Sequence, residues 1–180
     1  MNLFEFRPEK NVKKLGMITG LLLLGAAVLL LITVIISDVP YRWAIQLLSL
    51  GMLTVSIFIT SRYIMKSYVY AVIKADDGGN DFTVTEIQGR HVITVCRIGL
   101  SSVEQVVVVN QGDKVADTEV KNKIKSEKRK SFNYQADLLG EKYICLFVNE
   151  CGEQMAIKLS WGEELEKIFE NTLDGKGENT

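Results

Sequence analysis

Two long uncharged stretches near the start of the chain constrain its fold more than any other feature. The first, from Leu15 to Ile36, reads LGMITGLLLLGAAVLLLITVII, and the second, from Trp43 to Ser61, reads WAIQLLSLGMLTVSIFITS. At a rise of about 1.5 Å per residue, a helix of either length spans most or all of a hydrocarbon core of roughly 30 Å. Neither stretch has a polar face, and the remainder of a 180-residue chain is too small to bury both. We therefore expect two transmembrane helices.

A cleaved signal peptide is the alternative interpretation of the first stretch. Lys13 and Lys14 would form its basic n-region. However, the apolar run is longer than a signal-peptide h-region of about 7–15 residues, and no A-x-A-like cleavage site precedes the second stretch. The sequence therefore favours a membrane anchor.

Basic residues precede the first stretch and follow the second. Before the first and after the second stand Arg7, Lys10, Lys13, Lys14, Arg62, Lys66 and Lys74. The connecting segment SDVPYR carries only Arg42. By the positive-inside rule, both termini are expected in the cytoplasm, in a multi-pass protein of the plasma (bacterial inner) membrane. Residues 1–67 would form the N-terminal segment and anchor, 68–174 a cytosolic domain, and 175–180 a polar tail.

Beyond the anchor, the sequence changes to short segments rich in β-branched and aromatic residues. Seven of them are separated by turn signals: SYVYAVIK, DFTVTEIQ, HVITVCRI, VEQVVVV, FNYQAD, KYICLFVN and EQMAIKLS. Short connections join antiparallel neighbours, so seven strands in a meander is the simplest expectation.

The last part of the cytosolic domain has helical spacing. Trp161, Leu165, Ile168, Phe169 and Leu173 form one apolar stripe. The stretch SWGE before it has the form of a capping box, in which a serine hydroxyl and a glutamate cap the first turn. This pattern predicts a C-terminal amphipathic helix that covers one end of the sheet.

The segment DFTVTEIQGRHVITVCRIGLSSVEQVVVV, placed after two transmembrane helices, resembles the membrane-anchored bacterial pleckstrin-homology-like (PH-like) proteins. The family pattern xIxLSxIxxV is matched here by the run from Arg97 to Val106. The resemblance covers about residues 62 to 174 and implies a seven-stranded antiparallel PH-like barrel capped by a C-terminal α-helix. It also implies a non-enzymatic module that binds lipid headgroups or protein partners.

One feature departs from the lipid-binding members of that family. Those members carry Lys and Arg in and beside the first hairpin loop, whereas this chain has KADDGGND, with Asp76, Asp77 and Asp81. Negative charge there opposes an anionic headgroup, so the family's lipid site is not expected at this loop.

The strongest local candidate for function is the basic run KNKIKSEKRK at residues 121–130. Its cationic members are Lys121, Lys123, Lys125, Lys128, Arg129 and Lys130. On a tethered domain, each charge could contribute about 1 kcal/mol near an anionic leaflet. A solvated loop or short helix is the open alternative. Nucleic acid is disfavoured, because aromatic platforms are scarce among these residues and the formal net charge of the chain is −1.

Gly16 and Gly20 form a G-x-x-x-G motif in the first apolar stretch. Such a motif lets two helices approach closely in lipid. It could mediate either the contact between the two helices of one chain or a homodimer.

Catalytic and metal-binding motifs are not recognisable in this sequence. Cys96, Cys145 and Cys151 lack C-x-x-C or Cys/His spacing, and we expect them to be small buried residues. His91 is expected to be an exposed strand residue. We therefore expect no catalytic site, no cofactor and no metal.

Together these patterns predict a non-enzymatic, membrane-anchored module that presents a protein- or lipid-binding surface at the cytoplasmic face. An accessory subunit of a membrane complex, which contacts partners through its transmembrane helices, is the alternative.

Overall fold

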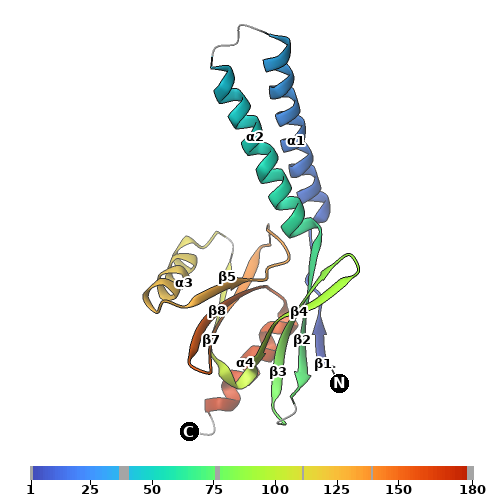
Figure 1. Cartoon of the computed structure of the whole chain (residues 1–180). Helices are drawn as coiled ribbons and strands as arrows, with labels where there is room; N and C mark the ends of the chain where they lie inside the picture. Colours follow the sequence, from blue (N-terminus) through green and yellow to red (C-terminus); the bar gives the residue numbers. More distant parts are fainter. Residues whose placement is uncertain (1, 37–40, 76–77, 111, 139, 178–180) are drawn as a thin grey trace. The chain divides into compact units, whose positions relative to one another are not determined.

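The computed structural model describes residues 2–36, 41–75, 78–110, 112–138 and 140–177 (Figure 1). The chain forms two units. A β unit is built from Met1–Lys10 together with Ser67–Thr180, and a helical unit is built from Asn11–Lys66. The helical unit is thus inserted between the first strand of the β unit and the rest of it.

The helical unit contains the two expected long helices. Helix α1 spans Val12–Ile35, and α2 spans Arg42–Ile59 and continues as a π-helical turn, η1, over Thr60–Ile64. Asn11 caps α1, since its side chain accepts a hydrogen bond of 3.2 Å from the backbone N–H of Lys14. Both helices are long and apolar enough to cross a membrane.

Small and hydroxylated residues fill the contact between α1 and α2. Ser49 Oγ donates to the carbonyl of Ala26 at 3.0 Å, and Ser56 Oγ donates to the carbonyl of Thr19 at 3.4 Å. All four residues are buried. Small side chains let helix backbones approach closely, and hydroxyl groups provide hydrogen bonds between helices where water is absent.

The first sheet of the β unit has the strand order β1-β2-β3-β4. Its strands are β1 (Asn2–Phe6), β2 (Lys66–Lys74), β3 (Asn80–Gln88) and β4 (His91–Gly99). Strand β1 pairs antiparallel with β2, and Phe6 lies opposite Tyr70. This corrects the expected boundary of the anchor, because the residues before α1 belong to the β unit.

The second sheet has the order β5-β7-β8-β6. It contains β5 (Val103–Asn110), β6 (Lys130–Asn133), β7 (Lys142–Glu150) and β8 (Glu153–Ser160). A 3-10 turn, η2, at Leu100–Ser102 precedes β5, and helix α3 (Lys114–Ser126) lies between β5 and β6 in the chain. Strand β6 runs parallel to β8.

Six of the strands expected from the sequence are present as β2, β3, β4, β5, β7 and β8, and β1 is an additional strand. The expected strand FNYQAD is right only in part, because β6 spans Lys130–Asn133 and residues 134–137 lie outside it. The antiparallel meander is wrong, because β5 pairs with β7 and β6 pairs in parallel with β8. The described strands form two four-stranded sheets rather than a closed seven-stranded barrel.

Both sheets and helix α4 (Glu163–Gly177) contribute to one apolar core. Leu165 and Phe169 of α4 are fully buried, and the ring of Phe169 lies edge-on to that of Phe82 at 5.2 Å between centroids. Trp161 and Ile168 pack at the margin of the core. The expected C-terminal amphipathic helix is therefore present.

Tyr70 makes a polar link inside this core. Its hydroxyl donates to the carbonyl of Tyr134 at 2.7 Å and accepts from the N–H of Ser160 at 3.1 Å. Burial raises the pKa of Tyr70 to about 12. Ser160 Oγ accepts from the N–H of Ala136 at 2.8 Å, so this serine joins β8 to the chain after β6. The predicted helix cap at this serine is wrong, because Ser160 ends β8 and Gly162 directly precedes α4, with its carbonyl accepting from the N–H of Glu166.

Candidate functional site

The basic run of residues 121–130 does not form one continuous surface loop. Lys121, Lys123 and Lys125 lie on α3, and Lys130 begins β6. Lys128 occupies the turn between them with a φ of 51°. One side of α3 packs on the second sheet, where Val120 is buried. The remaining described residues of that cluster are Ala116, Ile124, Val107, Val109, Tyr143, Cys145, Phe147 and Ala156.

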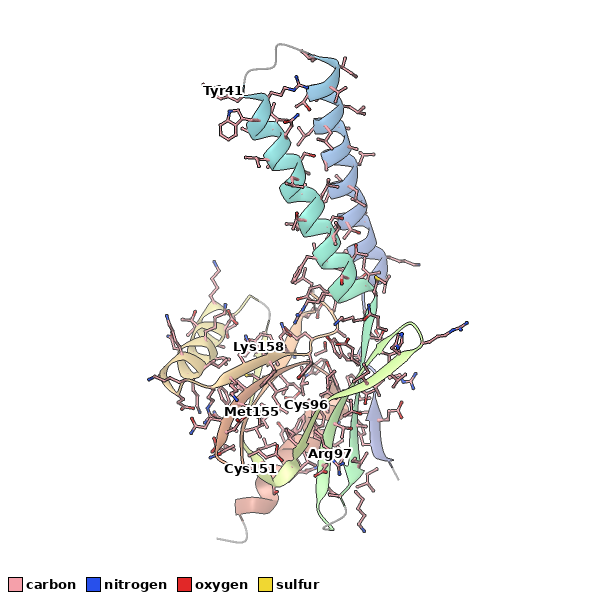
Figure 2. The ribbon with its side chains drawn as sticks, in the orientation of Figure 1. Tyr41, Cys96, Arg97, Cys151, Met155 and Lys158 are labelled. Atoms are coloured by element: carbon pink, nitrogen blue, oxygen red, sulfur yellow. The ribbon has the colours of Figure 1, made fainter. Side chains whose placement is uncertain are left out.

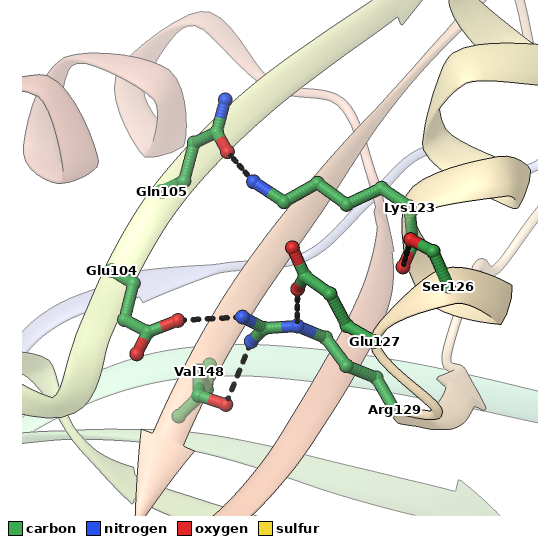
Figure 3. A network of polar contacts seen from close by, with 7 residues as sticks. All are labelled: Glu104, Gln105, Lys123, Ser126, Glu127, Arg129 and Val148. Atoms are coloured by element: carbon green, nitrogen blue, oxygen red, sulfur yellow. Dashed lines mark hydrogen bonds and ion pairs between the residues drawn. The ribbon is translucent and has the colours of Figure 1, made fainter.

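Arg129 is buried, with only 5% of its side chain exposed. Figure 3 shows its guanidinium held by three acceptors. Nη2 donates to Glu104 Oε2 at 2.7 Å, Nη1 donates to the carbonyl of Val148 at 3.3 Å, and Nε donates to the Glu127 carboxylate. Arg129 thus joins β5, β7 and the turn after α3. This corrects its expected role as a contact for an anionic surface.

Other members of the run also have partners within the chain. Lys123 Nζ contacts the Gln105 amide oxygen (Figure 3) and lies 4.6 Å from the centroid of the Phe147 ring. Lys130 pairs with Glu153 at 3.0 Å. Lys121 pairs with an aspartate one turn earlier on α3. These lysines already have ion-pair, amide or ring partners and are therefore less available to an external anion.

Lys125 and Lys128 remain. Among the described residues, neither has a side-chain hydrogen bond or ion pair, and both are exposed. The surface for non-specific anion binding is therefore smaller than six cations.

The charges around α3 hold two carboxylates in their ionised form. The hydrogen bond from Arg129 lowers the pKa of Glu104. The hydrogen bonds from Lys121 and Tyr143 lower the pKa of Asp117. The hydroxyl of Tyr143 donates to Asp117 Oδ1 at 2.7 Å, and burial together with this bond raises the pKa of Tyr143. The polar groups here stabilise the fold by binding one another.

Between α3 and β5 lies a groove of about 180 Å³, which we call the α3 groove. It is lined by Gln105, Val107, Ala116, Glu119, Val120, Lys123 and Phe147. Its floor is apolar, and its rim carries an amide, a carboxylate and an ammonium group. Apolar clefts with a few polar groups at the rim are typical of binding surfaces. Sequence reasoning missed this groove, although the spacing of Ala116, Val120 and Ile124 indicates a helix with one apolar side.

A larger and more polar pocket of about 470 Å³ lies beside the end of β1. Its lining includes Arg7, Glu9, Asp137, Lys142 and Trp161. The ammonium of Lys142 sits 4.7 Å from the centroid of the Trp161 ring. Partial burial of Lys10 lowers the pKa of its ammonium group, and the negative charge of Asp137 offsets only part of this shift. The mixed charges of this pocket do not select for either sign of ligand.

The G-x-x-x-G motif does not form the contact between α1 and α2. A Cβ added to Gly16 or Gly20 would have no heavy atom within 4 Å, whereas one added to Gly25 would lie 2.8 Å from Met52 Cε. Of these three glycines, Gly25 is therefore the one that faces α2. Gly16 and Gly20 face away from α2 on the exposed side of α1.

The cysteines differ in exposure. Cys145 is buried, as expected, and Cys96, which is labelled in Figure 2, is half-buried. Burial raises the pKa of each of these two thiols to about 11. Cys151 is exposed in the turn between β7 and β8, which corrects the expectation that it is buried. His91 is exposed at the start of β4, as predicted. In the described part of the chain, no three His, Cys, Asp or Glu side chains are grouped as metal ligands.

Comparison with known proteins gives no relative for this chain. We found no match among protein-family models, curated proteins or solved structures. We therefore infer the function of this protein from the geometry of its own residues.

Proposed function

We propose that this protein is a non-enzymatic, membrane-anchored binding module. Its helical unit spans the membrane, and its β unit presents the α3 groove to a protein partner at the cytoplasmic face. The observation that carries the proposal is the pairing of β1 with β2, because these strands stand before and after the two membrane-length helices.

The β1–β2 pairing restricts how the chain can lie in a bilayer. Phe6 and Tyr70 are partners in one sheet, so both ends of the helical unit connect to the same β unit. If α1 and α2 each cross the membrane once, the start of α1 and the end of α2 lie on the same side of it. The lysines and arginines that flank this pair support the cytoplasmic side for the β unit. Tethering then raises its local concentration near membrane-bound partners.

The α3 groove supports a protein partner more than a metabolite. Its volume is below the 300–1,000 Å³ or so typical of small-molecule pockets. Val115 of α3 is also exposed, which adds apolar surface on the same helix. A short apolar side chain of a partner, flanked by groups that pair with Glu119 and Lys123, fits the composition of the groove.

Site-specific photo-crosslinking in native membranes tests this proposal. A photoreactive amino acid replaces Glu119 at the rim of the groove in the full-length chain. Leu24, on the exposed side of α1, and Lys125, on α3 outside the groove, serve as matched positions. We expect a discrete adduct with a second protein from position 119 and a much weaker one from position 125. Filling the groove with Ala116→Trp should abolish the adduct, and an adduct unchanged by Ala116→Trp would contradict the proposal.

An accessory subunit that binds through its helices is the second candidate. It is favoured by Gly16 and Gly20, whose positions on α1 have room for a neighbouring helix. In the same experiment it predicts adducts from position 24 and none from position 119. A second copy of this chain at position 24 would indicate a homodimer.

Within the basic run, anionic headgroups would be contacted at most through Lys125 and Lys128, since its other cations have partners within the chain or are buried. Membership of the PH-like family is proposed from the sequence resemblance alone. The strand order β5-β7-β8-β6 differs from the antiparallel barrel that this resemblance implies.

A further inference from the structure

The turn between β3 and β4 carries an unusual exposed tip. The turn residues Gly89 and Arg90 follow Gln88, which pairs with His91. Next come Val92 and Ile93, with 64% and 61% of their surfaces exposed. We call residues 88–93 the hairpin tip.

Both faces of the hairpin tip are apolar at its start. Successive residues of a strand point to opposite faces, so Val92 and Ile93 project in opposite directions. Across the ladder, Val92 lies opposite Ile87 and Ile93 lies opposite Glu86. A strand that only covers the core buries one face and exposes the other. Here the first four residues of β4 are all exposed, and two of them are large and apolar.

The hairpin tip lies at the end of the first sheet from which the chain leaves for the helical unit. Thr83 Oγ1 donates to the carbonyl of Ala71, and the Tyr68 hydroxyl donates to Glu86. These contacts place the beginning of β2 beside the end of β3. Lys66, where the helical unit ends and β2 begins, is therefore at the same end of the sheet as Gln88, where β3 ends. The end of β1 is at this end too, because Phe6 pairs with Tyr70.

We propose that the hairpin tip inserts into the interface of the bilayer that holds the chain's own helices, with Val92 and Ile93 among the lipid headgroups and upper acyl chains. This inference rests on the proposed membrane anchoring. Arg90 and His91, at the very tip, would lie beside phosphate groups, and Lys66 begins the adjacent strand at the same end of the sheet. The carboxylate of Glu86, opposite Ile93, sets the depth at which insertion ends.

A bilayer fits the tip better than a protein surface does. A partner protein, or a second copy of this chain, would cover one face of the hairpin tip and leave the other in water. Lipid surrounds an inserted side chain and buries both faces. The covalent connection of β1 and β2 to the helical unit also keeps this end near the bilayer without any partner.

Spin labelling of the full-length chain in vesicles of phosphatidylcholine and phosphatidylglycerol tests the proposal. One label is placed through Val92→Cys and another through Ile93→Cys, each in a Cys151→Ser background. The control label is on native Cys151, which follows Glu150, whose carboxylate accepts from the N–H of Gly99 at the opposite end of β4. Cys96 and Cys145 react slowly, because burial raises their pKa values and keeps the thiols protonated.

The readout is the accessibility of each label to oxygen, which concentrates in lipid, relative to a water-soluble nickel complex. We expect this ratio to be at least about fivefold higher at both 92 and 93 than at 151. Equal ratios at all three positions, in protein that floats with the vesicles, would overturn the inference and leave the anchoring intact. An immobilised label at only one of positions 92 and 93 would also overturn it, in favour of a protein contact.

A failure of the anchoring itself is recognised separately. If the chain does not float with the vesicles after alkaline extraction, both this inference and the proposed function fall. A Val92→Asn, Ile93→Asn variant keeps the hairpin turn and should retain flotation. In that variant, a label placed through Arg90→Cys should show a much lower ratio of oxygen to nickel accessibility than the same label does when Val92 and Ile93 are present.

Discussion

Phe6 and Tyr70 lie opposite each other in β1 and β2, with ring centroids 6.1 Å apart, although the whole helical unit separates them in the sequence. This pair closes the β unit around the point where the chain leaves for α1 and returns from α2. The strand that precedes the first helix is therefore part of the folded β unit, and its removal would expose the edge of β2.

The packing of Phe6 against the start of α4 gives the first prediction. A Cβ added at Gly162 would lie 2.4 Å from Phe6 Cζ. Gly162→Ala should therefore destabilise the β unit by about 1–3 kcal/mol, as expected for overpacking. Chemical denaturation in detergent, followed by circular dichroism in the β-sheet region, measures the free energy of unfolding.

The matched control for this prediction is Gly162→Ala in a Phe6→Ala background. There the added methyl group has space, so its cost should fall to about 1 kcal/mol or less, the size of a glycine-to-alanine difference at a helix start. Additive costs in the double variant would mean that Phe6 does not pack on Gly162.

The buried guanidinium gives the second prediction. Arg129→Ala removes the guanidinium donor from Glu104, Glu127 and the Val148 carbonyl. Because both carboxylates are partly exposed, we expect a loss of about 2–4 kcal/mol, below the upper range for a fully buried pair. Lys125→Gln removes a nearby exposed charge and should change stability by no more than about 0.5 kcal/mol. Similar effects of the two substitutions would contradict the structural role of Arg129.

The lowered pKa values of Glu104 and Asp117 predict how stability depends on pH. A carboxyl group with a lower pKa in the folded state stabilises that state above its ordinary pKa, and this contribution disappears as the pH falls through the folded value. The wild-type chain should therefore lose stability between about pH 5 and pH 2. A Glu104→Gln, Asp117→Asn variant should be less stable at pH 7 and show a shallower loss on acidification. Equally steep acid unfolding in the variant would refute the assignment, and Glu141→Gln controls for the loss of a surface carboxylate.

The glycines of α1 give a fourth prediction. Gly25→Leu should disrupt the packing of α1 on α2, because even a Cβ at this position meets Met52 at 2.8 Å. Gly16→Leu should leave that packing intact, since nothing lies within 4 Å of its Cβ. Thermal unfolding of the helical signal in micelles distinguishes the two variants. If Gly16→Leu removes a dimer band on native gels and Gly25→Leu does not, the G-x-x-x-G motif of Gly16 and Gly20 mediates self-association.

Several elements could be predicted from the sequence because their signals are local. The apolar stretches identify α1 and α2, and alternation between turn signals identifies β2, β3, β4, β5, β7, β8 and part of β6. The spacing from Trp161 to Phe169 identifies α4. Each of these patterns depends on residues close together in the chain.

The rest depends on contacts between distant residues. Strand β1 has only the short alternation of Phe4, Glu5 and Phe6, which does not identify its partner 64 residues later at Tyr70. The parallel pairing of β6 with β8 depends on β7 lying between β5 and β8. The burial of Arg129 also depends on Glu104 and Val148 in two other strands. Charge composition alone therefore overestimated the size of the cationic surface.

Labelling one cysteine on each side of the bilayer shows whether α1 and α2 span the membrane. Inside-out and right-side-out membrane vesicles are treated with a membrane-impermeant maleimide. One sample carries the native Cys151 of the β unit, and the other carries Tyr41→Cys, before α2, in a Cys151→Ser background. With the β unit in the cytoplasm, we expect Cys151 to react only in inside-out vesicles. The thiol at position 41 should react only in right-side-out vesicles. Reaction of both thiols from the same side would contradict a membrane-spanning anchor.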